Sequence, residues 1–425
     1  MVRAAFVLTL EDHLYWPDEI AFNNIALGLL NGRGYQSDLY RANPVLPFFL
    51  ALVYQFVGHN YIVARLIQGL IGSLTVYLMA ALTQQLYGRR VAFIAGLCLA
   101  VFPSLVYICG VFYVECLFTS LIALSIYTLY ISSKYKGLWS FILLILCGIM
   151  IGVTILCRAI FLAFLPFAFL FVMFSYKEST VRRILYAIAL MLMACLTFLP
   201  WTFRNYALYG RVVAVSTGSG LFLWKGNNEL ARGDTHDRYL EPGVGETWTN
   251  RLQELAPAHR SELMQKYSAV QRDLDTLDEI DQDKYLQRLA LTFISEHPAW
   301  SLILFIRKVG TLYTAFTEVR TENSSIISMK KRLGLSFVFY VTLTLGVAGM
   351  LYTLRKWQQC LILYLPIVAL TLAYGLLTSA ARFRIPFEPH MIIFASYSVI
   401  VLFDVTRTHV VKIFERVYLQ TVRRP

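Results

Sequence analysis

The feature that most constrains this chain is a series of apolar runs, each close to the length of about 20 residues that a helix needs to cross a bilayer. Charged residues make up only 15% of the 425 residues, against about 25% in soluble domains. The sequence therefore predicts an all-α polytopic membrane protein, a bundle of about nine or ten transmembrane helices. Nine runs can be drawn, at residues 61–82, 91–108, 112–131, 138–156, 158–175, 184–203, 333–354, 359–378 and 388–404.

Basic residues between these runs predict the sidedness of the chain. They cluster in alternate loops, as the positive-inside rule expects of cytoplasmic loops. Residues 1–60, 204–332 and 379–387 are then external. The net charge of +12 does not indicate nucleic-acid binding, because the bases form no basic face or RNA-binding motif. The clusters are Arg89 with Arg90, Lys134 with Lys136, Lys177 with Arg182 and Arg183, Arg355 with Lys356, and the tail after Asp404.

The external insert differs in charge from the rest of the chain. Residues 229–297 hold 14 of the 26 acidic residues and 8 of the 38 basic ones. Residues 301–318, which follow, are apolar but carry Arg307 and Lys308. We expect an interfacial helix there, because a spanning helix would reverse every later segment and put the basic tail outside.

The pattern of runs and loops divides the chain into six parts. We expect residues 1–17 to be the remnant of a truncated first transmembrane helix whose beginning lies upstream of Met1. Residues 18–60 form an external loop with two interfacial amphipathic helices, which Gly32 and Gly34 separate. The other parts are a six-helix transmembrane module at 61–203, the external insert and interfacial helix at 204–332, the C-terminal transmembrane helices at 333–405 and a basic cytoplasmic tail at 406–425.

Charged residues that border apolar runs are costly to bury and are candidates for function. Asp18 and Glu19, in Trp-Pro-Asp-Glu, open the first external helix. One interpretation makes them a cap that complements the helix dipole. The other makes them a general base for an acceptor hydroxyl at the membrane boundary.

Further candidates lie near the same boundary. Glu115 is the one charged residue of its run, and Arg158 lies between two runs. Each is either a side chain that reaches toward the interface or part of a reacting centre.

The last candidates for the predicted site are mainly arginines. Arg382, Arg384 and Glu388 occur in Ala-Arg-Phe-Arg-Ile-Pro-Phe-Glu-Pro between the last two runs, and Arg41 lies in the first loop. External arginines oppose the positive-inside rule, and a guanidinium suits the phosphate of a membrane lipid. The alternative is that they only reach toward the interface. No phosphate-binding glycine loop or metal-binding histidine pair occurs, so the sequence does not indicate an ATPase or a zinc protease.

These motifs together resemble those of the GT-C glycosyltransferases, which use sugars linked to polyprenyl phosphate. The resemblance is carried by Trp-Pro-Asp-Glu-Ile-Ala-Phe, Arg-Ala-Asn-Pro-Val-Leu-Pro, Tyr-Val-Glu-Cys-Leu-Phe, Pro-Trp-Thr-Phe-Arg-Asn-Tyr, Leu-Trp-Lys-Gly-Asn-Asn and the arginine motif at 381–389. The chain looks similar to the dolichyl-phosphate-mannose protein mannosyltransferases of glycosyltransferase family 39 and to the lipid A aminoarabinose transferase.

The resemblance implies a mechanism and its residues. The catalytic carboxylate of the first loop corresponds to Asp18, with Glu19 beside it, and a second external acid corresponds to Glu115. The lipid phosphate would bind Arg41, Arg382 and Arg384, with Arg158 and Glu388 as weaker candidates. Sugar would pass, with inversion, from a polyprenyl-phosphate donor to a hydroxyl acceptor (a protein, a glycolipid or a polymer). No cofactor is required, although a divalent metal near Asp18 and Glu19 stays open.

The expected location is a bacterial inner membrane, with the active site facing the periplasm. Two other classes of function remain open: a transporter or lipid flippase, and a non-catalytic subunit with the same scaffold. Transporters commonly place ionisable residues at mid-membrane, whereas the candidates here cluster at the outer boundary. The sequence therefore favours the glycosyltransferase.

Overall fold

A computed structural model describes residues 1–37, 43–232, 257–315 and 329–422. Throughout these ranges the regular structure is helical, without strands, which confirms the all-α prediction. The α-helices are α1 (Val2–Val7), α2 (Pro17–Leu30), α3 (Val45–Val57), α4 (Tyr61–Tyr87), α5 (Arg89–Val101), α6 (Pro103–Tyr107), α7 (Val114–Ser132), α8 (Gly137–Cys157), α9 (Leu165–Ser175), α10 (Thr180–Tyr209), α11 (Ser219–Gly226), α13 (Pro257–Thr276), α14 (Glu279–Glu296), α15 (Pro298–Leu312), α16 (Met329–Thr353), α17 (Trp357–Leu376) and α18 (Glu388–Val422). Three short 3-10 helices join them: η2 (Ala159–Phe164), η4 (Leu354–Lys356) and η5 (Ala381–Phe387).

The chain is a multi-pass membrane protein. Within the described ranges, six helical runs are long and apolar enough to span a bilayer, or seven if α14 and α15, bent by 112°, count as one span. The run Lys331–Leu376 contains both α16 and α17, which η4 separates. The other five runs are Tyr61–Tyr87, Val114–Ser132, Gly137–Cys157, Thr180–Tyr209 and Ala381–His409.

The last three long helices alternate in direction. Gly346 of α16 lies against the Met391 backbone of α18, and Gly349 lies against the backbone of Phe394. A Cβ at Gly349 would come within 2.2 Å of the Phe394 carbonyl oxygen, so only glycine permits this close approach. From the first contact to the second, both helices advance by the same number of residues in the same direction, so α16 and α18 run parallel. The helix α17, which lies between them in sequence, therefore runs in the opposite direction.

Two of the nine predicted spans are not continuous helices. The run 91–108 breaks at Phe102, whose extended backbone precedes Pro103, the first residue of α6. The run 158–175 starts with an extended Arg158 and one short 3-10 helix, and α9 then begins with Pro166 in its first turn. Proline lacks an N–H and disfavours a helical residue before it, so the prediction of one continuous helix from apolar length alone was wrong at Phe102.

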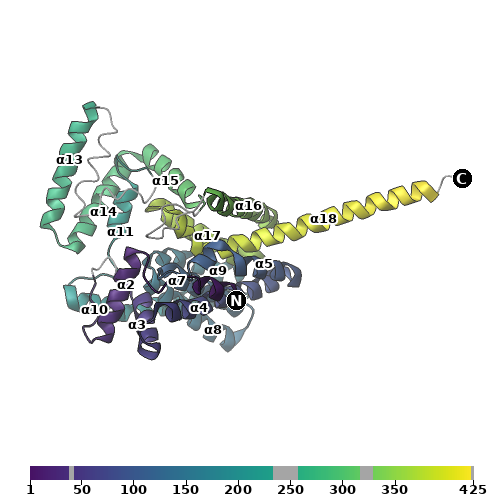
Figure 1. Ribbon diagram of the computed structural model, residues 1–425, viewed down its shortest axis with the longest axis horizontal. Coiled ribbons are helices and arrows are strands. Elements are labelled where there is room, and N and C mark those ends of the chain that lie inside the picture. The colour runs from purple at the N-terminus through teal and green to yellow at the C-terminus, as the bar shows by residue number, and fades with distance from the viewer. Residues whose placement is uncertain (38–42, 233–256, 316–328, 423–425) are drawn as a thin grey trace.

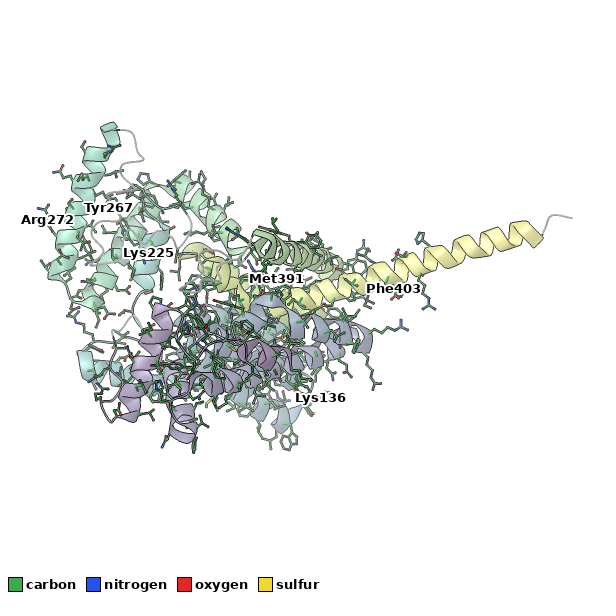
Figure 2. All side chains as sticks on the ribbon, viewed as in Figure 1. Lys136, Lys225, Tyr267, Arg272, Met391 and Phe403 are labelled. Carbon is green, nitrogen blue, oxygen red and sulfur yellow. The ribbon has the colours of Figure 1, made fainter. Side chains whose placement is uncertain are left out.

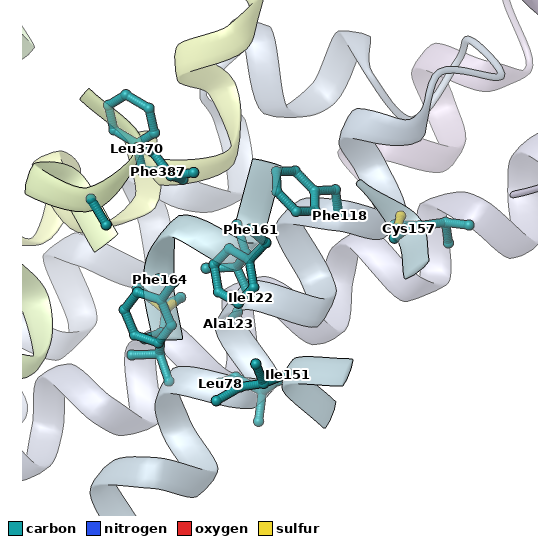
Figure 3. Packing of buried hydrophobic residues seen from close by; sticks show 14 of the residues in the cluster. Leu78, Phe118, Ile122, Ala123, Ile151, Cys157, Phe161, Phe164, Leu370 and Phe387 are labelled. Atoms are coloured by element: carbon teal, nitrogen blue, oxygen red, sulfur yellow. The ribbon is translucent and has the colours of Figure 1, made fainter. Parts of the chain in front are cut away.

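Aromatic packing ties the C-terminal helices to the first half of the chain (Figure 3). The Phe118 ring of α7 meets the Phe161 ring edge-on at 5.8 Å, and Phe161 stacks on Phe164 at 4.9 Å. Leu370 of α17 and Phe387 of η5 belong to the same buried cluster. This core therefore fixes η5, which carries the predicted arginines, relative to α7.

Two parts of the chain extend from the bundle (Figure 1). The helix α18 begins inside it and projects away, so that Met391 is 4% exposed and Phe403 is 63% exposed (Figure 2). The insert has a separate small core, in which the Trp224 ring of α11 lies 6.0 Å from the Tyr267 ring of α13. The predicted interfacial helix at 301–318 corresponds largely to α15, and its relation to the membrane stays a prediction.

Candidate active site

The structure brings the first and last predicted site segments together. Asp18 lies in the first turn of α2, and Arg382 lies in η5. The Asp18 Oδ2 and Arg382 Nη2 atoms are 3.7 Å apart, and the two side chains are 40% and 32% exposed. This spacing is too long for a strong hydrogen bond and the pair is partly exposed, so a substrate can separate the two charges without disrupting a buried pair.

Aromatic rings hold Arg382 in place. Its guanidinium carbon lies 5.0 Å from the Tyr113 ring centroid and 5.5 Å from that of Phe383. The Trp16 ring, directly before α2, lies 6.0 Å from the Tyr113 ring, and its Nε1 donates to the Tyr107 hydroxyl at 3.2 Å. The rings of Tyr113 and Phe383 therefore attract the positive charge of Arg382 and fix its position.

A second ion pair lies beside the first. Glu115, in the first turn of α7, is 3% exposed, and its Oε1 lies 3.1 Å from Nη1 of Arg158, just after α8. The guanidinium carbon of Arg158 is 4.5 Å from the Phe383 ring centroid, the same ring that Arg382 contacts. The two guanidinium groups are therefore within about 10 Å of each other. Asp18, Glu115, Arg158 and Arg382 thus form one cluster of four charged groups around Phe383.

Glu19, in contrast, points into the protein. Its Oε1 accepts from the Phe112 N–H at 2.8 Å, and its Oε2 accepts from the backbone N–H groups of Tyr15 and Trp16 at 2.8 and 3.1 Å. The side chain is fully buried, and burial raises the pKa of its carboxyl even though Arg65 and these donors oppose the rise. Both oxygens are engaged, so Glu19 fixes the start of α2 instead of facing Asp18.

Arg65 completes this buried anchor and was missed by the sequence reasoning. It lies in α4 with no exposed surface, 3.5 Å from Oε1 of Glu19. Its other N–H groups donate to the carbonyls of Glu11 and His13 at 2.9 and 2.6 Å. The signal was available, because Arg65 is the one charged residue in the apolar run 61–82.

Arg384 and Glu388 form a second buried anchor. The Arg384 Nε lies 2.9 Å from the Glu388 Oε1, and Nη1 donates to the carbonyls of Leu312 and Thr314. Ser104 donates to the other Glu388 oxygen. Both charged residues are at most 2% exposed. The expectation that Arg384 binds phosphate beside Arg382 is therefore corrected: its N–H groups hold η5 against α15 and α18.

Two further predictions concern Arg41 as a phosphate-binding residue and a divalent metal near Asp18 and Glu19. Arg41 lies outside the described residues. In the described part of the chain, no three His, Cys, Asp or Glu residues are grouped so that they could hold a metal ion. A divalent metal bridging Asp18 and Glu19 does not fit this arrangement, because both Glu19 oxygens already accept from backbone N–H groups.

Comparisons with known proteins found one matching family model and several similar solved structures. The family model described as dolichyl-phosphate-mannose-protein mannosyltransferase matches residues 41–201. The oligosaccharyltransferase AglB from Archaeoglobus fulgidus, solved with an inhibitory peptide and dolichol-phosphate, is similar with a TM-score of 0.54 and 14% identity, over 98% of this chain and 51% of that one. ArnT from Cupriavidus metallidurans bound to undecaprenyl phosphate has a TM-score of 0.46 and 15% identity, over 93% and 76% of the chains. No curated protein matches the sequence significantly.

The comparisons confirm the resemblance to the GT-C glycosyltransferases, and the chain has the fold of these membrane enzymes. The family match covers less than half of the chain, and the chain spans about half the length of the oligosaccharyltransferase.

Proposed function

We propose that this protein is an inverting membrane glycosyltransferase, which moves a sugar from a polyprenyl-phosphate donor to a hydroxyl acceptor. The observation that carries the proposal is the approach of Asp18 to Arg382 at 3.7 Å, where both side chains are partly exposed. Once a substrate has separated the two charges, Asp18 can accept the proton of an acceptor hydroxyl and Arg382 can bind the donor phosphate. The family match and the shared fold support this reaction class.

In the proposed reaction, Asp18 accepts the proton of the acceptor hydroxyl as its oxygen attacks the anomeric carbon. The bond from that carbon to the phosphate oxygen breaks at the same time, and attack from the opposite face inverts the carbon. Arg382 stabilises the negative charge that develops on the departing lipid phosphate. The donor supplies its own leaving group, so no nucleotide takes part.

The second ion pair has a supporting role in this proposal. Arg158 adds a second positive charge near Arg382, and Glu115 orients Arg158 through an ion pair of 3.1 Å. Glu115 is nearly buried, whereas the Arg158 side chain is 19% exposed. We therefore assign the contact with substrate to Arg158 and the positioning of Arg158 to Glu115.

The orientation of the helices supports an external site, on the periplasmic side of a bacterial inner membrane. The helix α7 begins at Val114 beside the charged cluster and ends at Ser132, next to Lys134 and Lys136. The site and this basic loop are therefore at opposite ends of a spanning helix. The positive-inside rule assigns the basic end to the cytoplasm.

The substitution Asp18→Asn tests the proposal. We expect sugar transfer from a radiolabelled polyprenyl-phosphate sugar to fall by about 10²–10⁴-fold, the usual contribution of a general base. Binding of the donor and the unfolding temperature should stay close to those of the wild type, because the side chain is partly exposed. The matched control is Glu11→Gln, which removes a carboxylate from the same loop that is 83% exposed. Undiminished transfer by the Asp18→Asn protein would overturn the assignment.

A further inference from the structure

Three buried hydroxyl groups near the charged cluster have no hydrogen-bond partner among the described residues. They belong to Tyr374, near the end of α17, and to Thr378 and Ser379, in the loop that leads to η5. These residues are 3%, 2% and 0% exposed. Buried hydroxyls without partners are uncommon, because burial removes water and leaves the donor and acceptor unsatisfied.

Several other buried hydroxyls in the bundle are paired. Ser120 bonds to Thr75 at 2.8 Å, and Ser125 pairs with Thr154 at 3.2 Å. The three unpartnered hydroxyls therefore do not reflect loose packing of all polar groups. They are concentrated in residues 374–379, directly before the arginine motif.

Ring stacking brings the segment that carries these hydroxyls close to the guanidinium groups. The rings of Tyr374 and Phe383 stack at 4.9 Å with an interplanar angle of 20°, so the segment between them closes into a loop. Arg158 lies 5.6 Å from the Tyr374 ring centroid and 4.5 Å from that of Phe383. Thr378 and Ser379 are in this closed loop, four and three residues before Arg382.

A buried lysine fixes the start of the loop. Lys308 of α15, fully buried, donates from Nζ to the carbonyls of Leu376 and Leu377 at 2.9 and 3.3 Å and to Asn227 Oδ1 at 2.9 Å. A Cβ at Gly226 would lie 1.7 Å from the Leu377 carbonyl oxygen, so glycine is required beside this contact. The loop is therefore held at both ends, by Lys308 and by the ring stack, and cannot simply collapse to pair its hydroxyls.

We propose that the hydroxyls of Tyr374, Thr378 and Ser379 form a hydroxyl subsite that donates hydrogen bonds to the phosphate oxygens of a lipid phosphate. The subsite rests on the proposed function and deepens it, because it adds neutral donors to the positive charges of Arg158 and Arg382. A phosphate has several non-bridging oxygens, each able to accept from an O–H group, and hydrogen bonds to a charged acceptor are the strong ones. Binding would satisfy groups that the protein itself leaves unpaired.

The double substitution Thr378→Val with Ser379→Ala tests the subsite. The probe is undecaprenyl phosphate without a sugar, added to the purified protein in detergent. We expect its affinity to fall by about tenfold or more, the effect of losing a hydrogen bond to a charged group. The unfolding temperature without ligand should be unchanged or higher, because the variant no longer buries two unsatisfied hydroxyls. A role in structure alone would instead lower this temperature and leave the affinity unchanged.

A matched control is available at the other end of the bundle. Ser175, the last residue of α9, also has a hydroxyl with no partner among the described residues. The Ser175→Ala protein should bind undecaprenyl phosphate as the wild type does. Thr378→Ser, which keeps a hydroxyl, should retain most of the affinity. Undecaprenol, which lacks phosphate, should bind more weakly than the lipid phosphate and should not distinguish the double variant from the wild type. Inorganic phosphate should also bind more weakly, and its affinity should be lower for the double variant than for the wild type.

The outcomes separate the subsite from the proposed function. Equal affinity of the wild type and the double variant for undecaprenyl phosphate would overturn the subsite, whatever the result for Asp18→Asn. A tenfold loss of affinity, combined with full sugar transfer by Asp18→Asn, would support the subsite and reject the catalytic assignment of Asp18. The binding assay contains no sugar, so it does not depend on transfer.

Discussion

The first external loop and the arginine motif each contain two like charges close in sequence, and in both cases only one of the two faces the site. Asp18 and Arg382 are partly exposed and meet each other. Glu19 and Arg384 are buried and bond to the backbone of other segments. The comparison separates an open pair, Asp18 with Arg382, from two anchors, Glu19 with Arg65 and Arg384 with Glu388.

Helix geometry explains this division. Consecutive residues of an α-helix point about 100° apart, so Asp18 and Glu19 cannot face the same partner. In a 3-10 helix with about three residues per turn, Arg382 and Arg384 also point in different directions. The anchors hold the backbone in place, and the open pair is partly exposed at the surface.

The largest effect on stability is expected from breaking an anchor. Arg384→Met leaves Glu388 buried without its partner and should lower the free energy of unfolding by about 3–5 kcal/mol. Arg382→Met, in the open pair, should change it by less than about 1 kcal/mol. Unfolding in detergent, followed by tryptophan fluorescence, measures both. Equal stability of the two variants would contradict the division into anchors and an open pair.

A smaller effect, on binding, is expected from Arg382→Lys. The charge is kept but the planar fork and its stacking on Tyr113 are lost, so the affinity for undecaprenyl phosphate should fall by about tenfold. The unfolding temperature should not change. Arg407→Lys, on the exposed part of α18, is a control with the same exchange of side chain. Unchanged affinity of the Arg382→Lys protein would contradict the assignment of Arg382 to the phosphate site.

The smallest effect is the pH dependence that Glu19 contributes. Burial raises the pKa of the Glu19 carboxyl above its ordinary value of 4.5, so the folded chain binds this proton more readily than the unfolded chain. The stability from this proton is fully present below pH 4.5 and is lost as the pH rises through the folded pKa. The unfolding temperature of the wild type, measured between about pH 4 and pH 7, should therefore fall relative to that of Glu19→Gln. A difference that is constant with pH would mean that the Glu19 pKa is not raised.

Much of the fold could be predicted from apolar length and charge. The runs 61–82, 112–131, 138–156 and 184–203 correspond to long helices, since each pairs about 20 apolar residues with polar ends. The break at Phe102 was missed because the apolar pattern continues through Pro103. This proline was the local signal that should have outweighed hydropathy.

Four of the predicted site residues, Asp18, Glu115, Arg158 and Arg382, lie in one cluster, and their roles stay predictions. The sequence alone determined that this chain is a helical membrane protein and which few charges lie at its boundary, because the cost of placing charge in hydrocarbon acts on each residue separately. Only the tertiary structure decided which of those charges meet. Whether Asp18 or Glu19 is open depends on what α4 and the segment before α7 present to α2, and those contacts join residues far apart in the chain.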